Sequence, residues 1–353
     1  YFDENGLHFK TPKDYILRHN ITEEGLLNVV DKFTNIKACI LGDIIIDEYI
    51  DSEALGMSQE DPTIAIKPLN SRKFIGGAGI VAMHGEKLGA NVNFMTVTGE
   101  DEHQELIQRE FKKTKITSTL FSDRLRPTNL KSRYRARNKT LLRVSHLHQH
   151  SISLELQNKI SEVIKRKISE YDLIVFSDFN YGSLPQTLVN KLTEIATKNS
   201  VPMVADSQSS SQNGDVTRFV GMDLLTPTEH EARVSLHNQD DGLVTLAEKL
   251  RVKSAAKNIM LKLAEEGVLL HQNIDRLKTG TDRIRSFNLN PADEAGAGDS
   301  MLIASALTYA TSKNFWLAAL VGSIAAGLQI SRIGNSPLSF KELCDTIENA
   351  QEN

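Results

Sequence analysis

The sequence of 353 residues has little cysteine, no long apolar run and nearly balanced charges. Its two cysteines, Cys39 and Cys344, lack the spacing of a metal site, so we interpret them as reduced thiols. The longest nearly apolar stretch, residues 316–330, is shorter than the ~20 residues that span a bilayer, and it predicts a buried helix. No secretory signal or internal repeat is visible. These absences favour a cytoplasmic protein with no membrane partner.

The overall charge and composition bear on the binding partners and on the number of domains. A formal net charge of -4 gives no global reason to expect nucleic acid as a partner, because proteins that bind phosphate backbones usually carry a basic balance. With 40% hydrophobic and 24% charged residues, the chain has room for one large α/β domain with an appendage, or for two smaller domains. The first residue is Tyr1 rather than Met, so domains upstream of the sequence are left open.

From residue 36 onward, short apolar runs alternate with amphipathic stretches. The runs predict buried strands at residues 38–47, 92–97, 173–177, 201–205, 224–226 and 259–263. Helical spacing of apolar residues predicts helices over 154–169 and 186–198. Alternation of this kind favours an α/β fold with a mostly parallel sheet and helices on both faces. Residues 1–35 are interpreted as an N-terminal extension with one helix, 22–33, capped by Thr22.

Two segments interrupt the alternation. Residues 49–73 and 120–144 are richer in charge and in β-formers, and we expect both to form strands of a small β-lid over the carboxyl edge of the sheet. Alternation on a strand places four cations of the second segment on one face: Lys131, Arg133, Arg135 and Arg137. This row has two possible explanations. It is either an edge strand whose positive charge prevents aggregation, or a site for an anionic group of a substrate.

A small-residue segment precedes the apolar run 301–310. Gly296, Ala297 and Gly298 allow backbone amides to gather at the start of the expected helix, where unsatisfied N–H groups and the helix dipole favour an anion. Asp299 stands at the same place, and beside a bound phosphoryl group it serves as a general base or as a metal-linked acid. The alternative is a glycine-rich turn with an ordinary capping aspartate.

Several strings occur in an order that points to one family. They are Gly42-Asp43 with Asp47, Ser58 to Pro62, Phe74 to Ala82, Leu88-Gly-Ala90, Thr98 to Asp101, the basic segment from Pro127 to Arg143, Ser177-Asp178, Asp206, Thr226-Pro227 with Glu231, Gly296 to Asp299, and Gly334. Together they resemble the ribokinase-like (PfkB) carbohydrate kinases, most closely the heptose-7-phosphate kinase domain of bacterial ADP-heptose synthesis enzymes. The resemblance implies a ribokinase-like, doubly wound α/β kinase domain over residues 36–348.

The resemblance also implies roles for individual residues. Asp299 would accept the proton of the attacking sugar hydroxyl, while Gly296, Ala297 and Gly298 hold the transferring phosphoryl group. The implied substrate-binding residues are Asp47, Gly76, Gly77, Lys131, Arg133, Arg137 and Asp178. The implied cofactor is ATP with Mg²⁺, and its residues are Asp206, Glu231, Gly267, Gly296 and Gly298. Glu231 would act on the Mg²⁺ through water, because hard cations prefer carboxylate oxygens.

The chain departs from the family pattern at several positions. They are Ile80, Tyr181, Gln208, Thr228, Lys262, Glu294 and Ala295. Tyr181 and Gln208 stand where the heptose kinases usually carry lysines, and Lys262 stands at a usual threonine position. Each lost cation or orienting group weakens transition-state stabilisation by ~2 to 4 kcal/mol.

Three interpretations follow from the retained and the lost residues. The first is an active ATP-dependent sugar or sugar-phosphate kinase, with D-glycero-D-manno-heptose 7-phosphate as the nearest substrate. The second is a non-catalytic module that binds a sugar phosphate or nucleotide. The third is the kinase half of a bifunctional kinase and nucleotidyltransferase. We favour an active kinase because Asp47, Glu231 and Asp299 persist. Unpaired edges of the lid also predict a homodimer formed through it.

Overall fold

The structure is a computed structural model that describes residues 12–137, 139–208, 214–275, 278–287, 292–332 and 334–349. Its α-helices are α1 Lys13–Arg18, α2 Glu23–Asp31, α3 Ala78–Lys87, α4 Glu102–Phe111, α5 Leu154–Lys167, α6 Gln186–Lys198, α7 Glu229–Leu236, α8 Leu243–Ser254, α9 Ala297–Ser312, α10 Phe315–Ile330 and α11 Phe340–Asn349. Its strands are β1 Lys37–Gly42, β2 Ile44–Met57, β3 Ile64–Gly77, β4 Asn91–Thr98, β5 Thr117–Ser122, β6 Asn129–Ala136, β7 Lys139–His146, β8 Leu173–Asp178, β9 Met203–Ser207, β10 Leu224–Leu225, β11 Asn258–Lys262, β12 Val268–Asp275 and β13 Lys278–Ile284. Short 3-10 turns occur at Lys32–Asn35, Ile168–Glu170, Val216–Arg218 and Ala264–Glu266.

The larger sheet has nine strands in the order β13-β12-β11-β10-β9-β8-β1-β4-β5. Every pair from β11 to β5 is parallel, and the antiparallel strands β12 and β13 extend one edge. Crossovers between parallel strands run through helices, which bury both faces of the sheet. The predicted α/β fold with a mostly parallel sheet is therefore confirmed.

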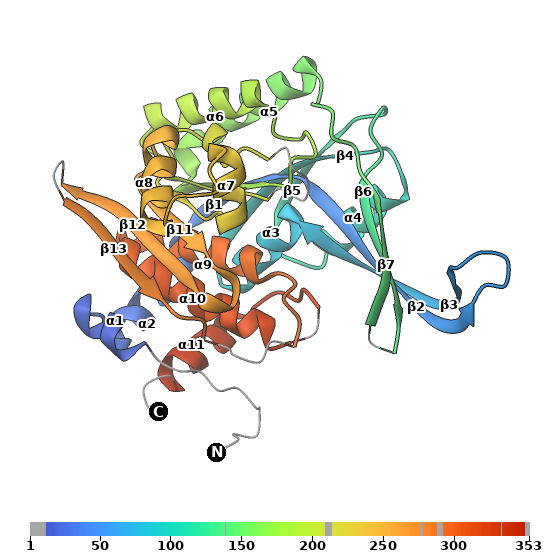
Figure 1. The fold of residues 1–353 in the computed structure, drawn as a ribbon. Coiled ribbons are helices and arrows are strands. Elements are labelled where there is room, and N and C mark those ends of the chain that lie inside the picture. The colour runs from blue at the N-terminus through green and yellow to red at the C-terminus, as the bar shows by residue number, and fades with distance from the viewer. Residues whose placement is uncertain are drawn as a thin grey trace.

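Alternation along the strands divides the core into two layers. In β1, Ala38 and Ile40 point into one layer, whereas Cys39 and Leu41 point into the other. The first layer is covered by α3, α9 and α10, and the second by α5, α6 and α8. Figure 1 shows α5 and α6 on the opposite side of the sheet from α9 and α10. Cys39 is a buried free thiol, as its strand position predicted.

The described part of the N-terminal extension packs onto the first layer. Thr22 caps α2 by accepting a hydrogen bond from Gly25 at 3.1 Å, which confirms the predicted helix start. The Tyr15 hydroxyl donates to the carbonyl of Trp316 at 2.8 Å, so α1 is tied to the start of α10. Residues 12–35 therefore contribute apolar side chains to the same core as the large sheet.

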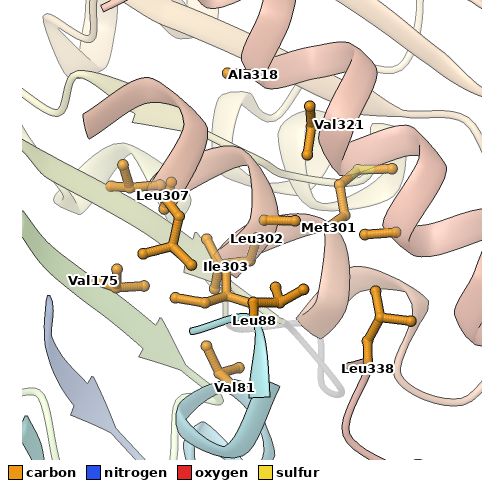
Figure 2. Packing of buried hydrophobic residues seen from close by; sticks show 14 of the residues in the cluster. Val81, Leu88, Val175, Met301, Leu302, Ile303, Leu307, Ala318, Val321 and Leu338 are labelled. Carbon is orange, nitrogen blue, oxygen red and sulfur yellow. The ribbon is translucent and has the colours of Figure 1, made fainter. Parts of the chain in front are cut away.

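Helix α9 is buried along its length and lies between α3, the sheet and α10. Figure 2 shows Leu302 and Ile303 of α9 pointing toward Val81 and Leu88, with Val321 of α10 on the other side. The helix begins at Ala297, so Asp299 lies inside its first turn. Helix α10 confirms the buried helix predicted for residues 316–330. Within the described ranges, no helix is long and apolar enough to cross a lipid bilayer.

The prediction of one strand over residues 38–47 was wrong, because the chain changes sheets at Asp43. Strand β1 ends at Gly42 in the large sheet, and β2 begins at Ile44 in a second sheet. The buried Asp43 carboxylate accepts hydrogen bonds from the amides of Phe179, Tyr181 and Ser183 at 2.9, 3.2 and 3.1 Å. An apolar-run pattern does not detect such a break, since both halves are equally apolar.

The second sheet is the lid, with four strands in the order β3-β2-β6-β7. It projects from the side of the large sheet, as Figure 1 shows. The predicted lid segment 49–73 lies in β2 and β3, but 120–144 was predicted to begin too early. Residues 117–122 form β5, which pairs in parallel with β4 at the edge of the large sheet. The lid strands of this segment are β6 and β7 alone.

Candidate active site

A cavity of about 950 Å³ opens between the lid and the large sheet. The lid contributes one wall with residues of β2 and β6, among them Asp47, Tyr49 and Arg133. The opposite wall consists of the loops after β10 and β11, together with α10. The first turn of α9 and the end of β11 also line the cavity. This position at the carboxyl ends of parallel strands is where open α/β sheets usually bind ligands.

The start of α9 has the backbone geometry of an anion cradle. Gly296 caps the helix with φ 83°, a conformation that favours glycine. A Cβ at this position would lie 2.2 Å from Oδ1 of Asn335, so a larger residue forces either the Asn335 side chain or the helix start to move. Within the described chain, no acceptor is recorded for the amides of Gly298 and Asp299. Ala297, Gly298 and Asp299 all line the cavity, so these amides are positioned for an anion.

Asp299 is held at the cavity by two side-chain amides. Its Oδ1 accepts from Nε2 of Gln208 at 3.4 Å, and its Oδ2 accepts from Nδ2 of Asn335 at 3.3 Å. Burial, and then repulsion from Asp206, raise the pKa of Asp299 to about 7. Asp47 on the lid side also raises this pKa. A carboxylate with a pKa near neutral is matched to proton transfer at physiological pH.

Lys262 ends β11 and supplies a cation beside the same helix turn. Its Nζ lies 3.0 and 2.9 Å from the two carboxylate oxygens of Asp206. Burial raises the pKa of Asp206 to about 6, against the attraction of Lys262, so the pair is ionised at neutral pH. Asp206 itself lies behind the cavity and does not line it, although it was predicted to contact the nucleotide.

Glu231 and Gly267 line the wall away from the lid, and their contact with a nucleotide stays a prediction. Glu231 forms a capping box with Thr228: its Oε2 accepts from the Thr228 amide at 2.7 Å, and its own amide donates to Oγ1 of Thr228 at 3.2 Å. Gly267 has φ 95°, and a Cβ there would lie 2.1 Å from the carbonyl oxygen of Ile284. Close approach of two backbones therefore explains this glycine.

Asp47 and Arg133 form an ion pair on the lid wall, and both line the cavity. Gly76 does not line it; a Cβ at Gly76 would lie 2.1 Å from Oδ2 of Asp47, so this glycine makes room for the carboxylate. Gly77 lines the cavity with φ 59°, and a Cβ there would lie 2.4 Å from the carbonyl oxygen of Asp43. Of the two predicted sugar-site glycines, one borders the cavity and the other supports Asp47.

The row of lid cations is only partly as predicted. Lys131 lines the cavity with its Nζ 5.2 Å from the ring centroid of Tyr181, and Arg133 lies 5.2 Å from the ring centroid of Tyr49. The pairing of β6 with β7 shifts register between Tyr134 and Arg135. Arg137 lies beyond the end of β6 with φ 47° and does not line the cavity, which corrects its predicted place.

Asp178 lies outside the cavity, contrary to its prediction as a sugar contact. It is buried at the end of β8, and its Oδ2 accepts from Oγ of Ser207 and pairs with Nη2 of Arg218, each at 2.6 Å. Its Oδ1 accepts from the amide of Asn180 at 3.2 Å. These partners turn the carboxylate toward the strand ends and the Arg218 loop, where it braces the structure.

The departures from the family pattern fall in two different places. Ile80 and Tyr181 are fully buried, and Tyr181 stacks on Phe179 beneath Lys131. The other five line the cavity: Gln208, Thr228, Lys262, Glu294 and Ala295. Of these, Gln208 points to Asp299, as described above.

Sequence reasoning missed two residues of the site. Lys262 appeared only as a departure, although its place at the end of a predicted strand was a usable signal. Asn335 lies in a loop, where no pattern marks it.

Comparison with known proteins identifies the family. A family model described as pfkB family carbohydrate kinase matches residues 35–340, which is most of the chain. The chain belongs to this family. The resemblance seen in the motifs is therefore confirmed, and with it the assignment to the carbohydrate kinases, which transfer a phosphoryl group to a sugar.

Curated pfkB relatives include heptose enzymes. The chain is 27% identical over 315 residues to the D-beta-D-heptose 7-phosphate kinase of Bordetella bronchiseptica, covering 89% of this chain and 96% of that protein. It is 28% identical over 320 residues to the bifunctional protein HldE of Geotalea uraniireducens, covering 89% of this chain. The chain spans 64% of that bifunctional relative, slightly less than two thirds of its length.

A solved structure with the same fold is that of Arabidopsis thaliana ribokinase complexed with ribose and ATP. It superposes with a TM-score of 0.68 at 17% identity, covering 89% of this chain and 99% of the ribokinase. This likeness establishes the ribokinase-like fold of the pfkB member described here.

Proposed function

We propose that this pfkB family member transfers the terminal phosphoryl group of ATP to a hydroxyl of a sugar phosphate, with a heptose 7-phosphate as the nearest substrate. The observation that carries the proposal is the place of Asp299: it lies in the cavity, in the first turn of α9, beside amides suited to an anion. A base and an anion cradle on the same helix turn are the two elements that phosphoryl transfer requires.

In this reaction Asp299 accepts the proton of the sugar hydroxyl while the hydroxyl oxygen attacks the terminal phosphorus. A new oxygen–phosphorus bond forms, the bond to the bridging oxygen breaks, and ADP leaves with the electron pair. Charge develops on the phosphoryl oxygens, which the amides of Gly298 and its neighbours stabilise. The gain of a proton by Asp299 suits its burial, which favours the neutral acid.

We propose that Mg²⁺ enters this site with the nucleotide. Among the described residues, no group of three or more histidine, cysteine, aspartate or glutamate side chains forms a metal cage. This fits Mg²⁺, which usually keeps several waters and binds through one or two carboxylates together with substrate phosphates. Glu231 lines the cavity and is the carboxylate we assign to its water shell. The ion would neutralise charge on the phosphates of ATP.

The preference for a phosphorylated sugar rests on the lid wall. Lys131 and Arg133 both line the cavity and add positive charge across from the helix turn. Asp47 pairs with Arg133 and is placed to accept hydrogen bonds from sugar hydroxyls. An anionic group on the substrate would be held by these cations, with the planar guanidinium of Arg133 suited to two phosphate oxygens.

The proposal is tested by measuring ADP release with ATP, Mg²⁺ and a panel of free sugars and sugar phosphates. We expect turnover with at least one sugar phosphate and a loss of about 10³-fold in kcat for Asp299→Asn, because the amide cannot accept the proton. The matched control is Asp223→Asn, a buried aspartate at the opposite ends of the strands that pairs with Lys257. Its kcat should stay near that of the native protein.

Two results would count against the proposal. Full activity of Asp299→Asn would remove the assigned base. Absence of turnover with every substrate, with ATP or a sugar phosphate still bound, would favour the non-catalytic binding module instead.

We also propose that two copies pair through their lids. The lid carries exposed apolar side chains on β2, β3 and β7, among them Leu55, Met57, Leu69 and Leu142. The order of the sheet leaves β3 as an edge strand, whose unpaired groups are a template for a second strand. We expect a second copy of this chain to cover this surface, because in a dimer with two-fold symmetry the same surface of each copy contacts the other copy.

A further inference from the structure

The ammonium of Lys262 faces the anion cradle more closely than any other cation described above. Its Nζ lies 3.4 Å from the position that a Cβ at Gly298 would occupy. The side chain is only 12% exposed, so little water separates it from the helix turn. This lysine therefore lies beside the place where the amides of Gly298 and Asp299 would hold an anion.

The ion pair with Asp206 leaves part of this ammonium for a ligand. Asp206 lies behind the cavity, and its two oxygens engage at most two of the three ammonium protons. Burial disfavours the charged form of Lys262, but the carboxylates of Asp206 and Glu231 outweigh it and raise its pKa. The cation is thus kept charged, fixed from behind and directed toward the cavity.

This arrangement offsets a loss that the sequence revealed. Tyr181 and Gln208 stand where the heptose kinases usually carry lysines, and Lys262 stands at a usual threonine position. Tyr181 is fully buried and does not line the cavity. Lys262 supplies positive charge to the cavity from β11.

We propose that Lys262 is a catalytic residue that donates a hydrogen bond to the transferring phosphoryl group and stabilises the charge on its oxygens. The inference rests on the proposed kinase function and deepens it. A fixed ammonium that is only 12% exposed stabilises developing negative charge more than a fully hydrated one does, and it needs no reorganisation during the reaction.

A structural role is the rival explanation, because the ion pair also ties the end of β11 to the end of β9. Binding measurements that need no turnover distinguish the structural role from the catalytic one. ATP and adenosine are titrated by calorimetry into the native protein and into Lys262→Met, with Mg²⁺ present. If Lys262 contacts phosphate, the preference for ATP over adenosine falls about tenfold or more, while adenosine affinity is unchanged.

Lys262→Met also leaves Asp206 unpaired, which by itself repels phosphate. The double variant Lys262→Met with Asp206→Asn removes this repulsion, and we expect its preference for ATP to stay low. Lys262→Arg, which keeps the charge, should recover part of the preference. In turnover assays Lys262→Met should lower kcat about 10²-fold and leave KM for the sugar phosphate nearly unchanged.

Lys257→Met is the matched control. Lys257 immediately precedes the same strand at its opposite end and pairs with Asp223 at 2.7 Å, so the substitution also breaks a lysine–aspartate pair. Its preference for ATP should equal that of the native protein.

The inference is overturned if folded Lys262→Met keeps the native preference for ATP, or if the double variant regains it. It is also overturned if the native protein does not prefer ATP to adenosine. If the native protein prefers ATP but turns over no sugar, and Lys262→Met abolishes the preference, the proposed function fails and the phosphate contact stands.

Discussion

The two walls of the cavity are built in opposite ways. The wall with the anion cradle belongs to α9, whose side chains pack between α3, the sheet and α10. The lid wall belongs to a four-stranded sheet that projects from the molecule and exposes large apolar side chains, among them Leu69 at 63%. In the proposed reaction, the atoms that must be placed accurately for phosphoryl transfer belong to the core, and the atoms proposed to select the substrate belong to a thin, exposed sheet.

The largest effect is expected at the capping glycine of α9. Gly296→Ala brings a Cβ to 2.2 Å from Oδ1 of Asn335, so either that side chain or the helix start must move. Asn335 donates to Asp299 and the helix start carries the amides of the cradle, so we expect kcat to fall about 10³-fold in either case. Gly221→Ala is the control: it has φ 75° but nothing within 4 Å of its Cβ. Both variants carry the same backbone strain, so steady-state kinetics should separate them. Equal activity of the two would show that the cradle tolerates displacement.

The next effect concerns stability and its dependence on pH. The pKa of Asp299 is raised from 3.8 to about 7, so the folded protein binds an extra proton between these values. The stability that this proton gives is fully present below about pH 4 and is lost as the pH rises through 7. Asp299→Asn mimics the protonated acid, and it should therefore exceed the native protein in stability at pH 8 by on the order of 2 kcal/mol.

Urea denaturation of both proteins at pH 5 and pH 8 checks this expectation. The gain should be smaller at pH 5, where the native acid is largely protonated. Asp223→Asn, which loses the ion pair with Lys257, should gain nothing at pH 8. A gain that is the same at both pH values would show that Asp299 does not titrate between them.

On the lid wall we expect an effect on substrate binding with little effect on chemistry. Arg133→Met removes a cavity cation and the partner of Asp47, so KM for a sugar phosphate should rise about tenfold or more while kcat changes little. Arg72→Met is the control, since Arg72 pairs with Asp51 on the same lid at 3.3 Å but does not line the cavity. A fall in kcat with unchanged KM would contradict this, because it would show that Arg133 acts in the chemical step rather than in substrate binding.

The smallest effect on folding is expected at the lid surface. Leu69→Ser removes an exposed apolar side chain, and the free energy of unfolding of the monomer should change by no more than about 0.5 kcal/mol. If two copies pair through their lids, the same change should shift the dimer toward monomer in sedimentation experiments. Leu125→Ser, at an 85% exposed position outside the lid strands, should leave the assembly unchanged.

Apolar runs and helical periods were enough to predict the six adjacent parallel strands from β11 to β4, because strands buried on both faces are apolar along their whole length. They did not predict β12 and β13 at the edge of the sheet. They failed at Asp43, where a single buried carboxylate separates two strands of different sheets. They also failed at residues 117–122, whose half-buried pattern resembles that of a lid strand but which pair with β4. Sheet membership depends on partners distant in the chain, which a local pattern does not contain.

Within the site, Gly296, Gly298 and Asp299 were predictable as cavity residues because helix starts that bind anions need small residues in a fixed order. The ion-pair partners of the charged side chains could not be predicted from the sequence. Asp178 and Asp206 occur at strand ends just as cavity residues do, but Arg218 and Lys262 draw them away from the cavity surface. Arg137 was misplaced because a bulge and a turn end the alternation of β6.

The continuity of β2 has a mechanical consequence. At about 3.3 Å per residue, Asp47 lies about 10 Å from the root of the strand at Ile44, whereas Met57 at the far end lies about 43 Å away. Asp47 therefore lies near the fixed end of the strand, and Met57 lies near its free end. A tilt about its root would displace the outer rim of the lid roughly four times as far as it displaces that carboxylate.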